Sequence, residues 1–383
     1  MGIQVFKPKF DIDSCLDEIR ECLAAGWPGM GYKTTAFEEE WKKYTGHPNA
    51  YYTNSGSAAV HLAVKVLKHQ ENWQEGDEVI STPLTFVATN HAALYEGLKV
   101  VFADVDQYMC LDPESVEERI TPKTRAVIFV GYGGRIGQLF RIIEICKKYR
   151  LKLILDAAHM AGTRVNGIIA GTISGIDVTA YSFHAVKNLS TGDSGMVCFR
   201  DPEADREVRK IAWLGVDKDT FSRNAAGKYS WQYDVEYLGY KYNGNSVMAS
   251  LALVQLRHLD DENARRREIG KLYDEAFRQM DYIEIVPTPY PDEASYHIYA
   301  ILVTDRDKLL EYLAEHGIGC SVHYKDNTEY KLYSYAADTC PRASAASKKL
   351  LTLPMHMYLS NEDVFEVTEH IKRYFEEVLK NGI

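Results

Sequence analysis

The sequence predicts an α/β protein with a mostly parallel sheet, followed by a smaller α+β region. Short apolar runs alternate with stretches of helical periodicity between about residues 35 and 197. Strands that are separated by helices pair as parallel neighbours in a sheet that helices cover. After about residue 246, long helical stretches replace this alternation. A chain of 383 residues also suits a large domain joined to a smaller one.

Individual elements follow from the same periodicities. Six buried strands are expected at residues 79–80, 100–103, 126–130, 153–155, 178–183 and 196–199. A helix is expected to begin near Thr35, which has capping-box spacing to Glu38, and to end near Gly46. Later elements are expected as helices at 246–280, 307–316 and 364–379 and strands at 296–303 and 319–324. We therefore expect a large domain over residues 1–245 and a small domain over 246–383.

Composition and charge exclude several classes of function. The formal net charge is −10, so the chain lacks the basic surface that nucleic acid or anionic lipid would require. No uncharged apolar run reaches the roughly 18 residues that a membrane helix needs. The seven cysteines are scattered without a CxxC pair, so neither a disulfide framework nor a metal site is predicted. These features favour a cytoplasmic protein with no nucleic acid or membrane as its partner.

Polar residues stand where expected strands and helices meet. The small residues around Ser55, Gly56 and Ser57 precede a helical pattern, and a helix N-terminus offers unpaired N–H groups to a phosphate. A serine there could also be a simple helix cap. Asp156 directly follows the strand at 153–155, which puts its carboxylate at the edge of the sheet where α/β proteins bind ligands. His159 is close by, and both residues could equally be structural.

One lysine, Lys187, follows the expected strand at 178–183 in a polar, glycine-containing turn. Most lysines are solvated surface groups, so this position alone is a weak signal. Together with the turn near Ser57, Phe86, Asp156 and Ser182, however, it completes a set that pyridoxal phosphate (PLP) enzymes require. The set comprises an amine for the cofactor, a carboxylate for the pyridine nitrogen, a flat group for the ring and a phosphate site. The sequence therefore predicts PLP as cofactor.

At these residues the sequence resembles the DegT/DnrJ/EryC1/StrS family of nucleotide-sugar aminotransferases. The similarity runs from GWPGMG at residue 26 nearly to the end of the chain. Its most specific block is YSFHAVKNLSTGDSGMV; the others are TNSGSAAVHLA, GDEVISTPLTFVATNHA, LILDAAHMAGT, YLGYKYNGN and VHY. The resemblance implies a fold-type I PLP-dependent transferase, in which a large domain holds a mostly parallel seven-stranded sheet and a smaller α+β domain follows.

The resemblance implies roles at individual positions. Lys187 matches the lysine that binds PLP covalently, Asp156 the partner of the pyridine nitrogen, His159 a contact of the ring hydroxyl, and Phe86 the aromatic on the ring. The phosphate contacts match four small residues, Ser55, Gly56, Ser57 and Ser182.

Further residues are expected to complete the site. Lys241 or Asn243 would reach the cofactor in the partner subunit of a homodimer with shared active sites, because this segment completes the neighbouring site in the family. Substrate contacts are expected at Trp27, His323 and Tyr324.

The implied reaction is transfer of an amino group from L-glutamate to a nucleotide-linked keto-sugar of the 3- or 4-keto-6-deoxy type. PLP would pass through pyridoxamine phosphate (PMP), and the product would serve bacterial surface-polysaccharide or glycan biosynthesis, such as lipopolysaccharide O-antigen. Two alternatives remain. A PLP-dependent sugar dehydratase would carry histidine where Lys187 stands. A catalytically silent binding or regulatory protein could use the same scaffold.

Two segments depart from the family pattern. The family commonly has TGEGG where this chain has Thr191 to Gly195 as TGDSG, so a serine replaces a glycine in the loop that carries Lys187. After Tyr324 the chain reads Lys-Asp-Asn-Thr at 325–328, where a proline-containing stretch is expected. In relatives that region helps to recognise the sugar nucleotide.

Overall fold

The computed structural model describes residues 2–217 and 232–381. Its centre is a seven-stranded sheet in the order β1-β9-β8-β5-β4-β2-β3. The strands are β1 (Tyr51–Thr53), β2 (Glu78–Ser81), β3 (Lys99–Phe102), β4 (Thr124–Val130), β5 (Lys152–Asp156), β8 (Val178–Ser182) and β9 (Gly195–Phe199). The five strands from β8 to β3 run parallel, whereas β9 is antiparallel to both of its neighbours. This sheet confirms the expected fold class.

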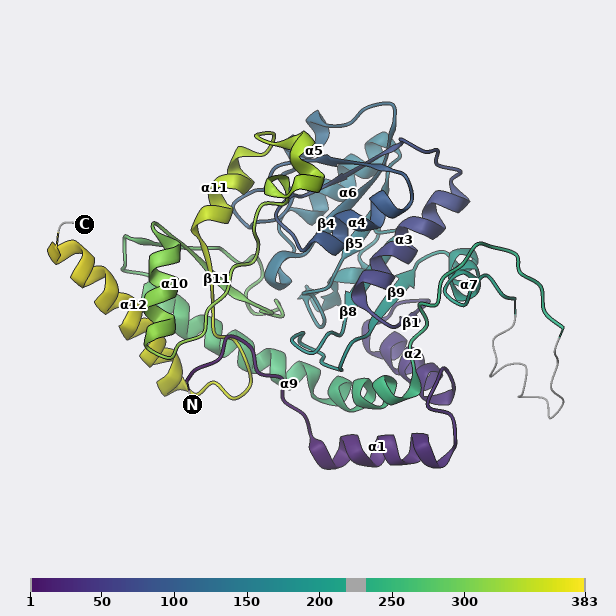
Figure 1. The fold of residues 1–383 in the computed structure, drawn as a ribbon, viewed down its shortest axis with the longest axis horizontal. Helices are drawn as coiled ribbons and strands as arrows, with labels where there is room; N and C mark the ends of the chain where they lie inside the picture. The colour runs from purple at the N-terminus through teal and green to yellow at the C-terminus, as the bar shows by residue number, and fades with distance from the viewer. Residues whose placement is uncertain (1, 218–231, 382–383) are drawn as a thin grey trace.

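Helices precede, connect and follow the strands of this sheet (Figure 1). They are α1 (Ile12–Ala24), α2 (Tyr32–Thr45), α3 (Gly56–Gln70), α4 (Val87–Tyr95), α5 (Pro113–Glu118), α6 (Leu139–Tyr149) and α7 (Pro202–Ile211). Helix α3 packs on β8 and β9, and α6 packs on β4 and β5. Because β5 and β8 are buried along most or all of their length, both faces of these strands are covered. A two-stranded ribbon, β6 (Arg164–Val165) and β7 (Ile168–Ile169), follows β5.

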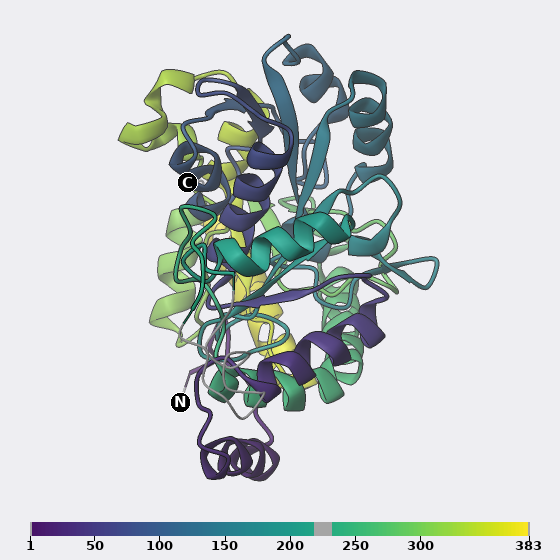
Figure 2. The same ribbon diagram turned by 90° about the vertical axis from the view of Figure 1, so that its right-hand side faces the viewer.

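A second, smaller core is built on an antiparallel sheet in the order β10-β11-β12. Its strands are β10 (Ile283–Ile285), β11 (Tyr299–Val303) and β12 (Leu350–Leu353). The helices after residue 245 are α9 (Ser246–Phe277), α10 (Arg306–Glu315), α11 (Pro341–Lys349) and α12 (Asn361–Asn381). Of these, α11 buries Ala343 and Ala346 in the large core. Helix α9 packs on α1 and α2 as well as on α12, so it extends from the large sheet to the small core (Figures 1 and 2). The domain boundary at 245/246 stays a prediction.

Three local expectations were wrong or incomplete. The short strands β1, β6, β7, β10 and β12 were missed, because runs of two to four residues have little readable periodicity. Residues 319–324 do not form a strand; only Ser321 makes an isolated bridge, to Thr352, before the chain turns toward the large sheet. Helix α2 begins at Tyr32 rather than near Thr35, and the Gly31 N–H donates to Thr34 Oγ1 at 3.1 Å. No helix among the described residues is long and apolar enough to span a bilayer.

Candidate active site

The carboxyl ends of the parallel strands and the N-termini of α3 and α4 surround a cavity of about 400 Å³. A cavity at this edge follows from parallel strands, because their polar end residues all meet there. Most predicted cofactor residues line it: Ser55, Gly56, Ser57, Phe86, Asp156, His159, Ser182 and Lys187. The predicted substrate residues His323 and Tyr324 also line it. Residues far apart in the sequence thus form one site.

One wall of the cavity is the N-terminus of α3. Ser55 is its N-cap and accepts a hydrogen bond from the Ala58 N–H at 3.1 Å. Gly56 lies against Ser182: a Cβ on Gly56 would stand 2.6 Å from the Ser182 Cβ and 2.8 Å from its Oγ. The exposed Ser57 adds a third hydroxyl. Free N–H groups, a helix dipole and these hydroxyls together suit a phosphate group.

Asp156 is the last residue of β5 and is almost fully buried. Its carboxylate accepts hydrogen bonds from Thr89 Oγ1 at 2.7 Å and from the Ala158 N–H at 3.1 Å. Burial raises the pKa of Asp156, while these donors and the nearby Lys187 oppose the shift. A buried carboxylate that is fixed by two donors is suited to hold a proton on a ligand nitrogen.

Lys187 lies in the loop between β8 and β9, and its amine faces the cavity. Burial lowers its pKa to about 8, although the negative charge of Asp156 opposes this shift. The amine is 3.4 Å from Nε2 of His297. An amine with a pKa this low is neutral in a substantial fraction of molecules near neutral pH, so it can act as a nucleophile or a base.

The loop that carries Lys187 is closed by the serine that departs from the family pattern. Thr191 Oγ1 donates to the Phe183 carbonyl at 2.7 Å, so the contact of 2.8 Å between Thr191 and Ser194 requires the Ser194 hydroxyl to be the donor. The Phe183 N–H in turn donates to the Ser194 carbonyl at 2.8 Å. The glycine-to-serine change therefore adds a hydrogen bond inside the loop and is accommodated without opening it.

His159 is neutral because burial lowers its pKa well below the usual value. Its Nδ1 accepts a hydrogen bond from the Gly133 N–H at 3.1 Å, so the ring proton must be on Nε2. Nε2 is 2.8 Å from the Tyr324 hydroxyl and donates to it. The hydrogen of Tyr324 is then free to donate to a ligand in the cavity.

Two aromatic rings and one further histidine complete the lining. Phe86 precedes α4 and is 61 % exposed, with its ring centroid 6.4 Å from that of Tyr324. His323 contacts Thr352 Oγ1 at 2.9 Å, and burial lowers its pKa to about 4. His159 and His323 are thus uncharged at neutral pH. They are the two cavity-lining histidines that the sequence predicted for the site.

Segment 325–328, the second departure from the family pattern, is tied to the same edge by amide groups. Asn327 Nδ2 donates to the Thr85 carbonyl at 2.8 Å, and Asn90 Nδ2 donates to Asn327 Oδ1 at 2.9 Å. Polar anchoring to the start of α4 therefore holds this segment beside the cavity.

Three predicted residues do not line the cavity. Trp27 lies between α1 and α2, where its carbonyl accepts from the Cys22 thiol at 3.5 Å. The Lys241 ammonium lies over the Trp213 ring, and Asn243 pairs with Thr53 at the end of β1. Roles for Lys241 and Asn243 in a partner's site stay predictions.

A buried carboxylate holds the segment of Lys241 and Asn243 in place. Glu96 accepts hydrogen bonds from His61, Tyr240 and Lys65, which lower its pKa to about 2 against the effect of burial. The Asn54 N–H and side chain donate to the carbonyls of Tyr242 and Lys241. The segment therefore runs behind the N-terminus of α3 rather than into this cavity.

Sequence reasoning missed three residues that hold the site together: Thr89, Asn188 and His297. Thr89 and Asn188 were visible inside the matched blocks but carried no signal of their own. His297 precedes β11, 110 positions after Lys187, so no local pattern connects the two.

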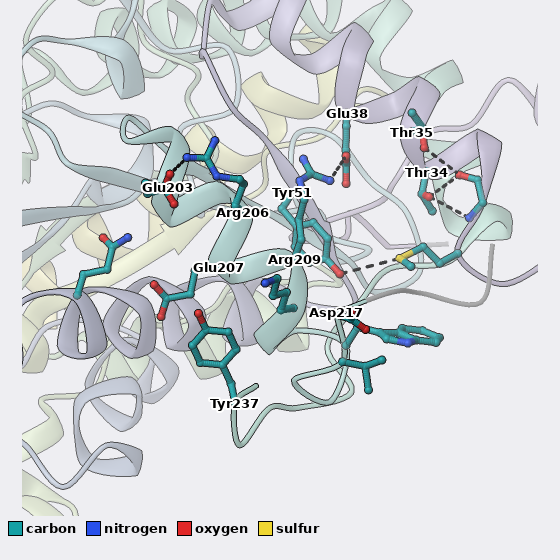
Figure 3. A pocket seen from close by; sticks show the side chains of 16 residues that line it. Thr34, Thr35, Glu38, Tyr51, Glu203, Arg206, Glu207, Arg209, Asp217 and Tyr237 are labelled. Carbon is teal, nitrogen blue, oxygen red and sulfur yellow. Dashed lines mark hydrogen bonds and ion pairs between the residues drawn. The ribbon is translucent and has the colours of Figure 1, made fainter. Parts of the chain in front are cut away.

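A second cavity, of about 650 Å³, lies between α2, β1 and α7 (Figure 3). Its charged side chains bind one another: Arg209 pairs with Glu38 and Asp205, and Arg206 pairs with Glu203. It also lies away from the carboxyl edge of the parallel strands. We therefore place the candidate active site in the first cavity.

Comparison with known proteins identifies the family of the chain and agrees with its fold. The family model described as the DegT/DnrJ/EryC1/StrS aminotransferase family matches residues 11–372. The chain belongs to this family. Among its relatives, the spore coat polysaccharide biosynthesis protein SpsC of Bacillus subtilis is 34% identical over 370 residues, covering 93% of each chain. The dTDP-4-dehydro-2,3,6-trideoxy-D-glucose 4-aminotransferase of Saccharopolyspora spinosa is also 34% identical, over 94% of each chain.

Solved structures of a putative sugar aminotransferase share the whole fold of this chain. The PMP form of the putative sugar aminotransferase Spr1654 from Streptococcus pneumoniae superposes with a TM-score of 0.90 at 29% identity, covering 100% of both chains. Its PLP form gives a TM-score of 0.89 at 28% identity, covering 99% of this chain and 100% of that one.

The contact between Gly56 and Ser182 gives a first test. We expect Gly56→Ala to weaken the binding of pyridoxal phosphate at least about tenfold, roughly 1.4 kcal/mol, because the added methyl must displace the Ser182 side chain. The dissociation constant is measured by absorbance titration of cofactor-free protein. Gly29→Ala is the control, because a Cβ there meets nothing within 4 Å. Equal affinity in the two variants would contradict a phosphate site at this contact.

Proposed function

We propose that the protein is a PLP-dependent aminotransferase that moves an amino group from L-glutamate to a nucleotide-linked keto-sugar. The observation that carries the proposal is the meeting of the Lys187 amine and the Asp156 carboxylate in one cavity at the carboxyl edge of the parallel strands. Membership of an aminotransferase family, with PLP and PMP forms among its structural neighbours, identifies pyridoxal phosphate as the cofactor.

The residues of the cavity fit this cofactor by their chemistry. Its phosphate suits the start of α3 and Ser182, its pyridine nitrogen suits the buried Asp156, and its aldehyde suits the Lys187 amine. The polar pair of His159 and Tyr324 offers a hydrogen-bond donor for the ring hydroxyl. Phe86 supplies an exposed aromatic face of the kind that a planar ring packs against.

When bound, PLP withdraws electrons from the carbon that carries the migrating amino group. The protein has to bind, orient and move protons around it. Asp156 would hold a proton on the ring nitrogen by charge pairing, which its own burial strengthens. Lys187, whose pKa burial lowers to about 8, can take a proton from a carbon and return it elsewhere.

Two observations support aminotransfer over the alternatives. A dehydratase of this type carries histidine at the position of Lys187, and a histidine cannot bind the cofactor covalently. A silent binding protein would have no need for an amine of lowered pKa beside a buried carboxylate. The geometry of Lys187 and Asp156 therefore favours an enzyme that reloads its own cofactor with an amino donor.

The relatives support a sugar nucleotide as amino acceptor. One relative is named for a 4-aminotransferase of a dTDP-linked sugar, and another for spore coat polysaccharide biosynthesis. We infer an acceptor of the 3- or 4-keto-6-deoxy type and a product used in bacterial surface polysaccharides. His323 and Tyr324 are the residues we assign to acceptor binding at this cavity.

The reaction is tested with a panel of keto-sugar nucleotides and L-glutamate. We expect one acceptor to gain an amine in place of its carbonyl oxygen, with one 2-oxoglutarate formed per turnover. Mass spectrometry of the sugar and an assay for 2-oxoglutarate measure the two products. Loss of water from the sugar without retained nitrogen would establish the dehydratase reaction instead.

Replacement of Asp156 by asparagine tests its role. We expect Asp156→Asn to fold normally, because the amide can still accept from the Ala158 N–H and contact Thr89. Its kcat should fall more than about tenfold, which corresponds to about 1.4 kcal/mol in the barrier. Asp177→Asn is the matched control, because Asp177 pairs with Lys152 at the opposite edge of the sheet. An Asp156→Asn enzyme with more than about a third of wild-type kcat would rule out the assigned role.

A mixing experiment tests the predicted homodimer with shared sites. Lys187→Ala is combined with a Lys241→Ala, Asn243→Ala double variant, each inactive alone. If segment 240–245 completes the partner's cavity, mixed dimers contain one intact site, and up to about half of wild-type activity per mixed dimer should return. Mixed dimers, verified by affinity tags, that stay inactive would show that the sites are not shared.

A further inference from the structure

His297 lies against Lys187 and belongs to the segment that precedes β11. Its Nε2 is 3.4 Å from Lys187 Nζ, and the imidazole is buried. None of the roles assigned above uses this residue. It therefore joins the small core directly to the amine of the site.

The side chain of Asn188, next to the lysine, fixes which ring nitrogen of His297 carries the proton. Asn188 Nδ2 donates to the Ser295 carbonyl and to Asn263 Oδ1, both at 2.8 Å. Asn263 cannot be reversed, because its own Nδ2 donates to the Ala161 carbonyl at 2.9 Å. Asn188 Oδ1 must therefore accept from His297 Nδ1, 3.0 Å away.

With its proton on Nδ1, a neutral His297 presents only a lone pair to the lysine. Burial keeps the ring neutral by lowering its pKa well below the usual value, and the charge of the neighbouring Lys187 acts in the same direction. The Lys187 amine must then donate to Nε2, because two facing lone pairs repel each other.

The ring of His297 is held rigidly in this position. It stacks on Phe6 with centroids 5.5 Å apart and planes within 4°, and its other neighbour is the His159 ring at 4.4 Å. Its backbone N–H donates to the Gly133 carbonyl at 3.2 Å. An acceptor fixed on three sides can orient a flexible amine, because the amine must turn to meet it.

We propose that His297, which Asn188 orients, is a positioning residue. It accepts a hydrogen bond from the Lys187 amine and thereby turns the lone pair of that amine toward the cavity. A neutral amine has two hydrogens and one lone pair. When one of these hydrogens points toward His297, the lone pair must point in another direction. This role rests on the proposed function, in which that lone pair binds the cofactor and takes up a proton.

Four titratable groups interact electrostatically with Lys187: Asp156, His159, His297 and His323. Because the three histidines are neutral, Asp156 supplies the only charge among them. A hydrogen bond to His297 stabilises the ammonium more than the amine, since a charged donor makes the stronger bond. Removal of the acceptor should therefore lower the pKa of Lys187 further.

Two substitutions of similar chemistry separate this role from simple packing. The amide oxygen of glutamine reaches close to the position of Nε2, so His297→Gln keeps an acceptor for Lys187. Asparagine is shorter and reaches only the position of Nδ1, so His297→Asn keeps a partner for Asn188 but leaves Lys187 without one. Both remove the ring that stacks on Phe6.

The first measurement uses full-length protein freed of cofactor. Acetylation of Lys187 by acetic anhydride is followed against pH by peptide mass spectrometry, which gives the pKa of the amine. We expect the pKa to fall by about one unit in His297→Asn and to stay within about 0.3 units of wild type in His297→Gln. The rate of pyridoxal phosphate capture, compared at equal neutral fraction, should fall about tenfold only in His297→Asn.

Other outcomes overturn the proposal. An unchanged pKa in both variants, or equal shifts in both, would leave His297 a packing residue. A raised pKa in His297→Asn would mean that water entering the vacated space, not the lost acceptor, controls the amine. The acetylation measurement needs neither substrate nor cofactor, so its result does not depend on whether the proposed reaction occurs.

A second measurement needs no variant. Exchange of the imidazole C2 hydrogen with deuterium, followed against pH in the wild-type protein, reports the titration of each histidine. The tryptic peptide spanning residues 279–306 contains His297 and no other histidine. We expect its titration midpoint well below the ordinary value of about 6.5. A midpoint at or above that value would mean a charged ring at neutral pH, which cannot accept from Lys187, and would overturn the proposal.

Discussion

Burial of the Asp156 carboxyl group and of the Lys187 amine governs the chemistry of these two groups. A low dielectric disfavours charge, so the carboxyl group holds its proton more readily and the amine releases its proton more readily than either would in solution. Their mutual attraction opposes both shifts but does not abolish them. The fixed donors Thr89 and Ala158 on one side and the acceptor His297 on the other set the positions of these two groups. The surrounding fold has to supply these partners and keep solvent out.

The parallel sheet meets much of this requirement by topology. Strands β4, β5 and β8 all end at the same edge, so a side chain at each end is brought near the others whatever the length of the intervening helices. The tight approach of Gly56 to Ser182 joins α3 to the end of β8 at that edge. The loop of Lys187 is closed by its own hydrogen bonds through Thr191 and Ser194, so it needs no ligand to define its path.

The sequence indicates which polar residues stand at strand ends and helix starts, because these positions are determined locally. Asp156, Ser182 and the serines before α3 are such positions, and the structure places them around one cavity. His297 could not be found in this way, because its relation to Lys187 depends on how the small core packs on the large sheet. The strand expected at 319–324 was wrong for a related reason: the segment passes from the small core, where Cys320 packs, to the large core, where Tyr324 packs, so it does not follow one sheet. Trp27, Lys241 and Asn243 lie outside this cavity, and their roles stay predictions.

Helix α9 gives the molecule a mechanical property. It has 32 residues, which makes it about 48 Å long at 1.5 Å per residue. Its first turns bury Ala249 and Ala252 in the large core, and its last turns bury Tyr273 and Phe277 in the small one. Asn263, midway along the helix, carries the hydrogen bond that orients Asn188. The two cores therefore share one continuous helix instead of a hinge. Any movement of one core against the other must strain α9, which also holds Asn188 in position beside Lys187.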